Sequence, residues 1–239
     1  MTMLWPDENI PESTGTDPVA KIDFGWQPTR RLPVYLLLDV SASMYGAPIM
    51  AVNEGVKLLY DQLIETPTAV ETVWISIITF GTEAVERVKL TPLTEFQPVE
   101  LEAGGTTSLG AAFRLLENSL DNDVHAGSET EKGDWRPLVY LLTDGEPTDE
   151  WEPVVERIHA RAEKKVGTII ALACGEDVDE QTLRQITTHV VRMENVSVDY
   201  LKSFFKWVSQ SVSGASVSAD AAGKTSQLLP PLPEGLSTI

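Results

Sequence analysis

The sequence predicts a doubly wound α/β fold with a mostly parallel sheet, one antiparallel edge strand, and helices on both faces. Two observations lead to this prediction: several short runs are apolar throughout, and amphipathic helical segments alternate with those runs. A continuous apolar run is typical of a parallel strand that is buried on both faces. Strands that alternate with helices favour right-handed crossover connections within one sheet.

The strands are expected to follow one another from about Arg30 onward. Buried strands are predicted from the apolar runs Val34–Leu38, Thr72–Phe80, Pro137–Thr143 and Thr168–Cys174, with a last strand over His189–Met193. The segment Ala84–Leu90 alternates apolar and charged residues, as a half-exposed antiparallel edge strand does.

Helices are expected between these strands. They are predicted over Ala47–Glu65, Ser108–Leu120, Trp151–Lys165, Asp179–Thr187 and Val198–Val212. Apolar residues recur in the first helix with the spacing of one helical face. Pro67 is expected to end that helix, because proline interrupts helical hydrogen bonding.

One folded domain is therefore expected over residues 30–212. Residues 1–29 are predicted to be a flexible extension, because prolines stand there among acidic residues and threonines without an apolar period. Residues 213–239 are predicted to be a linker followed by a proline-rich tail. The tail favours an extended polyproline conformation whose leucines a groove would accept, or it packs back on its own domain.

The composition excludes several classes of function. A formal net charge of −18 over 239 residues argues against binding to nucleic acid or to an anionic membrane. The single cysteine, Cys174, excludes an internal disulfide and a cysteine zinc cluster. No stretch reaches the roughly 18 apolar residues of a membrane helix, and the N-terminus lacks the pattern of a signal peptide. We therefore expect a cytoplasmic protein that binds neither nucleic acid nor membrane.

Oxygen-bearing side chains follow the first buried strand. In Asp39-Val40-Ser41-Ala42-Ser43, one carboxylate and two hydroxyls stand at alternate positions on the loop that leaves this strand. In open parallel sheets, ligands bind just outside the carboxyl ends of the strands. Hard oxygen donors suit a divalent cation such as Mg²⁺. The alternative is that Asp39 and the serines only cap the next helix.

Two further loops bring oxygen donors to the same edge of the sheet. Asp144 follows the strand that ends at Thr143, and the Gly104–Ser108 loop precedes a helix. Two carboxylates that meet without a cation would repel each other, so the combination favours a metal site. The acidic residues that follow Asp144 are interpreted as the first turn of the next helix, whose dipole favours them, and not as ligands; they are Glu146, Asp149 and Glu150.

The three motifs together resemble the metal-ion-dependent adhesion site (MIDAS) of the von Willebrand factor A (vWA) domain, a Rossmann-like fold. They are Asp-x-Ser-x-Ser from Asp39, Gly-Gly-x-Thr from Gly104, and Thr-Asp-Gly around Asp144. The resemblance implies that Ser41, Ser43 and a threonine bind the ion through their hydroxyls, while the two aspartates act directly or through water. It also implies a bound Mg²⁺, with Mn²⁺ or Ca²⁺ as alternatives, and a coordination position left for an Asp or Glu of a partner protein.

Two threonines fit the threonine position of this family. Counting from Gly104 in the Gly-Gly-x-Thr frame gives Thr107, whereas a bare Gly-Gly-Thr gives Thr106. We prefer Thr107, because Leu109 and Ala111 then take the usual positions at the start of the helix. Both threonines stay open at this point.

A narrower resemblance concerns the segment Arg31–Asp39 and the terminal Leu-Pro-Pro-Leu-Pro-Glu-Gly. Both are similar to bacterial TerY-like proteins of the tellurite-resistance and stress-response group. Members of that group are associated with protein phosphatases and kinases in small phosphorylation systems. The resemblance implies that this protein is an adaptor or scaffold and not an enzyme. It also implies that the partner protein is a phosphatase or a kinase.

The alternative function is a metal-dependent phosphatase or hydrolase that acts through Asp39. In haloacid-dehalogenase-like phosphatases the nucleophilic aspartate also follows a strand, but those enzymes need a second aspartate where this chain has Ser41. The sequence contains no Walker loop, nucleophile elbow or histidine-based triad. A third alternative is a structural module in which the site no longer functions.

Overall fold

The computed structural model of the chain describes residues 29–128, 132–161, 167–175, 178–193, 197–222 and 229–239. The extension predicted over residues 1–29 therefore lies outside the described residues, apart from residue 29. The strands are β1 (Leu32–Asp39), β2 (Val73–Phe80), β3 (Ala84–Pro92), β4 (Leu138–Thr143), β5 (Thr168–Cys174), β6 (His189–Met193) and β7 (Leu236–Thr238). The helices are η1 (Ala42–Met44), α1 (Ala47–Ile64), α2 (Pro67–Thr72), α3 (Leu109–Asp123), α4 (Glu152–Ala160), α5 (Glu180–Ile186) and α6 (Val198–Ala222).

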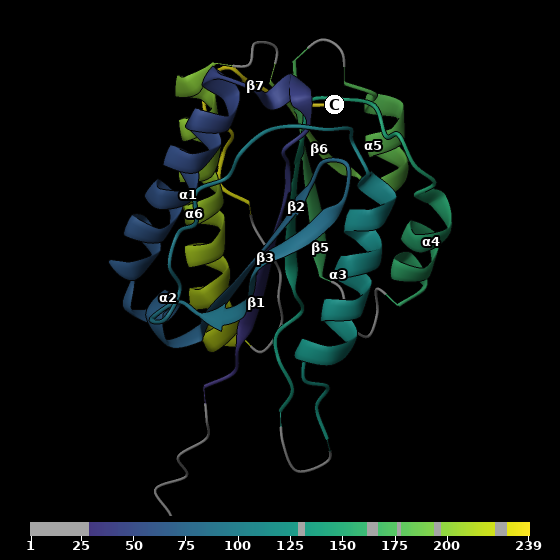
Figure 1. The fold of residues 1–239 in the computed structure, drawn as a ribbon. Coiled ribbons are helices and arrows are strands. Elements are labelled where there is room, and N and C mark those ends of the chain that lie inside the picture. Colours follow the sequence, from purple (N-terminus) through teal and green to yellow (C-terminus); the bar gives the residue numbers. More distant parts are fainter. Residues whose placement is uncertain (1–28, 129–131, 162–166, 176–177, 194–196, 223–228) are drawn as a thin grey trace, which may run out of the picture.

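These strands form one sheet in the order β3-β2-β1-β4-β5-β6-β7, and helices cover both of its faces (Figure 1). The five inner strands, β2, β1, β4, β5 and β6, run parallel to one another. The edge strands β3 and β7 are antiparallel to their neighbours β2 and β6. The predicted α/β fold class is confirmed. The sequence predicted only one antiparallel edge strand, and the second one, β7, comes from the segment that was expected to be a tail.

The sheet separates two apolar cores because side chains alternate along its buried strands. Leu36 and Leu38 of β1 belong to the core shared with α1 and α6, whereas Tyr35 and Leu37 belong to the core shared with α3, α4 and α5. Figure 1 shows α1, α2 and α6 on one side of the sheet and α3, α4 and α5 on the other. Strand β1 lies between β2 and β4, so its end at Asp39 is flanked by the ends of both neighbours.

The last helix is longer than the sequence predicted. Instead of ending at Val212, α6 continues to Ala222. Small residues make this possible, because they let the helix approach α2 closely. Ala215 is buried, and the Ser216 hydroxyl lies 3.2 Å from that of Thr68 in α2. Small polar residues that resemble a linker in sequence are here part of a packed helix.

The end of the chain packs on its own domain. Trp207 of α6 donates a hydrogen bond from Nε1 to the carbonyl oxygen of Pro230, at 2.9 Å. Strand β7 then pairs with β6, with Leu236 opposite Met193. The first part of residues 213–239 is therefore not a linker, because it continues α6 to Ala222. Of the two alternatives for the proline-rich tail, the described part shows the one that packs back on its own domain.

The described helices include none that is both long enough and apolar enough to span a membrane.

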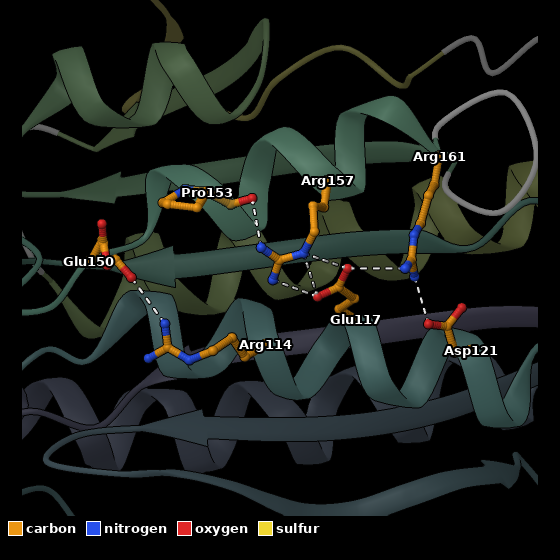
Figure 2. Close-up of polar contacts among 7 residues, drawn as sticks. All are labelled: Arg114, Glu117, Asp121, Glu150, Pro153, Arg157 and Arg161. Carbon is orange, nitrogen blue, oxygen red and sulfur yellow. Dashed lines mark hydrogen bonds and ion pairs between the residues drawn. The ribbon is translucent and has the colours of Figure 1, made fainter.

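An ion-pair network joins α3 to α4, which lie on the same face of the sheet (Figure 2). Arg157 of α4 donates to both carboxylate oxygens of Glu117 in α3, with Nη2 lying 2.8 Å from Oε2. Arg161 adds a second contact to Glu117 at 3.3 Å and a hydrogen bond to Asp121 at 2.6 Å. The Glu117 side chain is only 12% exposed, so these contacts hold a largely buried carboxylate between two helices.

The network predicts a specific pH dependence of stability. Hydrogen bonding from Arg157 holds the pKa of Glu117 below its ordinary value. A lowered carboxyl pKa stabilises the fold above the ordinary glutamate pKa, and this stability is lost as the pH falls through the folded-state pKa. We expect Glu117→Gln to weaken the pH dependence of the unfolding free energy, measured by urea unfolding between about pH 3 and 6. The control is Glu156→Gln at an exposed position of α4; equal pH dependence in both variants would contradict the assignment.

Candidate metal site

Asp39 ends the central strand and is fully buried. Its Oδ1 accepts a hydrogen bond from the backbone N–H of Ser41 at 2.8 Å, and its Oδ2 accepts one from the Thr143 hydroxyl at 2.6 Å. Burial raises the pKa of Asp39, hydrogen bonds from Ser41 and Thr143 lower it, and the neighbouring Asp144 raises it further. Within the described parts of the chain, no arginine or lysine pairs with Asp39. A buried carboxylate in this setting is costly unless a cation compensates its charge.

Two serine hydroxyls connect Asp39 to Asp144. The Oγ atoms of Ser41 and Ser43 lie 3.0 Å apart, and Ser43 donates a hydrogen bond to Oδ1 of Asp144 at 2.7 Å. Ser41 is buried and Ser43 is exposed, so this row of oxygens runs from the interior to the surface. Neither serine caps a helix, because Ser41 makes no side-chain cap to η1 and the N-cap of α1 is Gly46. The helix-cap interpretation of the two serines is therefore wrong.

The two candidate threonines occupy different environments. Thr107 is buried, and its hydroxyl lies beside Gly145, where an added Cβ would come within 3.3 Å of it. Thr106 is exposed, and its backbone N–H lies 3.4 Å from the Thr82 hydroxyl. The Thr107 hydroxyl thus lies against the loop that carries Asp144, whereas Thr106 is exposed at the surface. This placement favours Thr107 over Thr106 as the threonine of the site.

Backbone hydrogen bonds hold the three loops together. Gly104 donates to the carbonyl of Val40 at 2.7 Å, and Ala42 donates to the carbonyl of Gly105 at 3.1 Å. Thr148 donates to the carbonyl of Thr107 at 2.9 Å. The structure thus brings all five predicted residues to one end of the sheet, on loops that are fixed to one another; these residues are Asp39, Ser41, Ser43, Thr107 and Asp144.

Asp149 has a role that the sequence did not reveal. The acidic residues after Asp144 were expected in the first turn of the next helix, but α4 begins only at Glu152. Asp149 instead accepts hydrogen bonds from the backbone N–H groups of Gly110 and Ala111, at 2.7 and 2.8 Å, at the start of α3.

Two further contacts support the hydrogen bonds between Asp149 and the start of α3. The Arg114 guanidinium pairs with Asp149 at 2.9 Å and donates to the carbonyl of Glu150, a contact that Figure 2 shows. A Cβ added to Gly110 would come within 2.1 Å of that same carbonyl, so only glycine allows this approach. The loop of Asp144 is thereby clamped to the helix that follows Thr107. The sequence indicated that Asp149 lies near a helix N-terminus, where acidic residues are favoured. It did not indicate that this helix is α3, which precedes Asp149 in the chain.

The donor set consists of two carboxylates and three hydroxyls. Among the residues that the structure describes, no group of three or more His, Cys, Asp or Glu side chains is arranged to hold an ion. A metal at this site would therefore depend on the hydroxyls, as suits a hard cation such as Mg²⁺. Cys174 is buried, and burial raises the pKa of its thiol, so it offers no thiolate ligand.

A family model of the von Willebrand factor type A domain matches residues 34–206. The chain belongs to this family. vWA domains commonly mediate metal-dependent protein interaction and bind a divalent metal at their MIDAS. No match was found among curated protein sequences. The resemblance to TerY-like proteins stays a prediction.

Several solved structures share this fold. Proximal thread matrix protein 1 from the mussel byssus is 19% identical, with a TM-score of 0.56 over 78% of this chain and 49% of that chain. Another structure of that protein has a zinc-occupied MIDAS motif. The pilus adhesin SpaC from Lactobacillus rhamnosus GG is 14% identical, with a TM-score of 0.60 over 79% of this chain and 31% of that chain.

A bacterial structure matches along nearly its whole length. BatB from Bacteroides thetaiotaomicron is 19% identical, with a TM-score of 0.50 over 75% of this chain and 98% of that chain. By contrast, this chain spans about half of the mussel protein and about a third of the pilus adhesin. At these identities the likeness shows the fold alone.

Proposed function

We propose that this vWA domain is a divalent-metal-dependent protein-binding module whose bound Mg²⁺ is completed by an Asp or Glu of a partner protein. The observation that carries the proposal is the row of oxygens from buried Asp39 through Ser41 and Ser43 to Asp144, with the Thr107 hydroxyl beside it. A cation would balance the two carboxylates, and the exposed Ser43 end leaves room for an incoming carboxylate. Mn²⁺ and Ca²⁺ suit the same donors.

The surroundings of Asp39 support binding over catalysis. A nucleophilic aspartate must reach its substrate, but Asp39 is fully buried and both of its carboxylate oxygens accept hydrogen bonds. The proposed module therefore has no catalytic residue. A phosphatase acting through Asp39 would show metal-dependent turnover of generic phosphoesters that Asp39→Asn removes, and we expect no such turnover.

We propose further that the partner belongs to a cytoplasmic phosphorylation system of the bacterial stress response. The support is the resemblance of Arg31–Asp39 and of the chain end to TerY-like proteins. In that setting the domain would act as an adaptor for a protein phosphatase or kinase. The proline-rich end is packed against Trp207, so we assign partner binding to the metal site.

The two threonines provide a matched test of the site. We expect Thr107→Val to weaken Mg²⁺ binding about 10–100-fold, because the hydroxyl beside Gly145 is lost while the side-chain volume is kept. Thr106→Val, at the exposed neighbouring position, is expected to leave the affinity unchanged. Calorimetric titration of both variants with MgCl₂ and MnCl₂ gives the comparison. Equal affinities in the two variants, or stronger loss at Thr106, would remove Thr107 from the site.

A further inference from the structure

Two large apolar side chains are exposed next to the proposed metal site. Tyr45 is 80% exposed and Met50 is 62% exposed, the highest values among the large hydrophobic residues of the described chain. Tyr45 is two residues after Ser43, and Met50 lies in the first turn of α1, where its N–H donates to the carbonyl of Gly46. Neither contributes its side chain to either apolar core.

The charged side chains that belong to the loops around the site are all negative, although Arg114 of α3 reaches one of these loops and pairs with Asp149. The segments 40–46, 81–83, 102–108 and 144–151 contain no lysine, arginine or histidine. Their exposed carboxylates, which we call the glutamate rim, are Glu83, Glu102, Glu146 and Glu150. Within the described chain, none of the ion pairs involves a rim residue.

The glutamate rim restricts which carboxylate can reach the site. A divalent cation would balance Asp39 and Asp144, and it would leave the four exposed rim charges on the neighbouring loops without compensation. A partner carboxylate that approaches the ion therefore meets like charges, which cost several kcal/mol when juxtaposed in an interface. Lysine or arginine residues beside that carboxylate would turn this repulsion into attraction. The same argument disfavours a second copy of this chain, whose net charge is −18.

We propose that Tyr45, Met50 and the glutamate rim form a docking surface for a basic protein segment that carries a single Asp or Glu. This inference rests on the proposed function and specifies the partner of the same site. The carboxylate of the segment completes the metal, its lysines or arginines face the rim, and an apolar side chain covers Tyr45 and Met50. Large aromatic side chains that become buried in this way supply much of the energy of many interfaces.

The test uses short displayed peptides with one fixed central Asp and random flanking residues. They are selected on the full chain in MgCl₂ and recovered at low pH. Binding of each selected peptide, and of its version with Asn in place of the Asp, is then measured in MgCl₂ and in EDTA. We expect selected peptides to be rich in Lys and Arg and to carry an apolar residue near the Asp. Tyr45→Ser combined with Met50→Ser is expected to weaken their binding about tenfold. Changing all four rim glutamates to glutamine is expected to remove the preference for basic residues. Val217→Ser, at an exposed apolar position of α6, is the control and should change neither property.

The outcomes separate the two proposals. Selection that needs both the fixed Asp and Mg²⁺, but shows no basic preference and no effect of the serine variants, overturns the docking surface and supports the proposed function. Selection that depends neither on the Asp nor on Mg²⁺ overturns both. Peptides that are rich in acidic residues would likewise contradict the role of the glutamate rim.

Discussion

Replacing Asp39 with asparagine is expected to abolish the stabilisation of the protein by Mg²⁺ without destabilising the metal-free fold. For the wild type, Mg²⁺ at about 100 times its Kd adds about 2.7 kcal/mol to the unfolding free energy. In a domain of this size, that gain raises the Tm by about 5–10 °C. Asparagine keeps the shape of the side chain and an oxygen for the N–H of Ser41, but it removes the charge that a cation needs.

The metal-free variant should be as stable as the wild type at neutral pH, or more stable. Burial raises the pKa of Asp39 in the folded protein. A raised carboxyl pKa means that stability is fully present below the unfolded-state pKa and declines as the pH rises through the folded-state pKa. At neutral pH the wild type therefore bears the free-energy cost of this raised pKa, which asparagine avoids because it has no ionisable group.

Thermal unfolding in EDTA and in MgCl₂ measures both effects. The matched control is Asp61→Asn, the same chemical change at an exposed position of α1, which should keep the full Mg²⁺ shift. A shift of wild-type size in Asp39→Asn would show that Asp39 is not part of the metal site. A strong loss of stability in EDTA would show that the Asp39 carboxylate serves the fold, through its charge or as the acceptor for the Thr143 hydroxyl.

Local pattern was sufficient to predict the strands that carry the site. A strand that is buried on both faces is apolar throughout, so the first polar residues after an apolar run show where the strand ends. This pattern located the ends of the strands that precede the Asp39 and Asp144 loops. Because the sheet is parallel there, those ends converge as predicted. The choice between Thr106 and Thr107 could not be made by counting alone. It depends on which hydroxyl lies against Gly145, and this is a property of the folded loops.

The missed features depend on contacts between distant segments. Residues 213–222 have the composition of a linker, but Ser216 fits against Thr68 because it is small. Strand β7 is only Leu236–Thr238, too short to show a period, and it forms because the edge of β6 is available. Neither the contact of Ser216 with Thr68 nor the pairing of β7 with β6 can be inferred from the neighbouring residues in the sequence.

Asp149 is the strongest case of such a long-range contact, and its replacement by alanine is expected to weaken both the fold and the site. The change removes two hydrogen bonds to the start of α3 and the ion pair with Arg114. Losing a capping side chain of this kind costs about 1–2 kcal/mol of unfolding free energy. The loops of Thr107 and Asp144 would also lose their clamp. We therefore expect Mg²⁺ affinity to fall about 10–100-fold, as for other groups that position metal ligands.

The metal affinity distinguishes this positioning role from a purely structural one. Arg114→Gln removes the ion pair but leaves the Asp149 carboxylate on Gly110 and Ala111, so we expect a smaller loss of Mg²⁺ affinity than in Asp149→Ala. Affinities are to be measured by calorimetry at a temperature where urea unfolding shows every variant to be folded. If Asp149→Ala lowered the unfolding free energy but bound Mg²⁺ as the wild type does, Asp149 would stabilise α3 alone. Loss of affinity in the folded variant would show that the clamp between the two loops is what holds Thr107 beside Asp144.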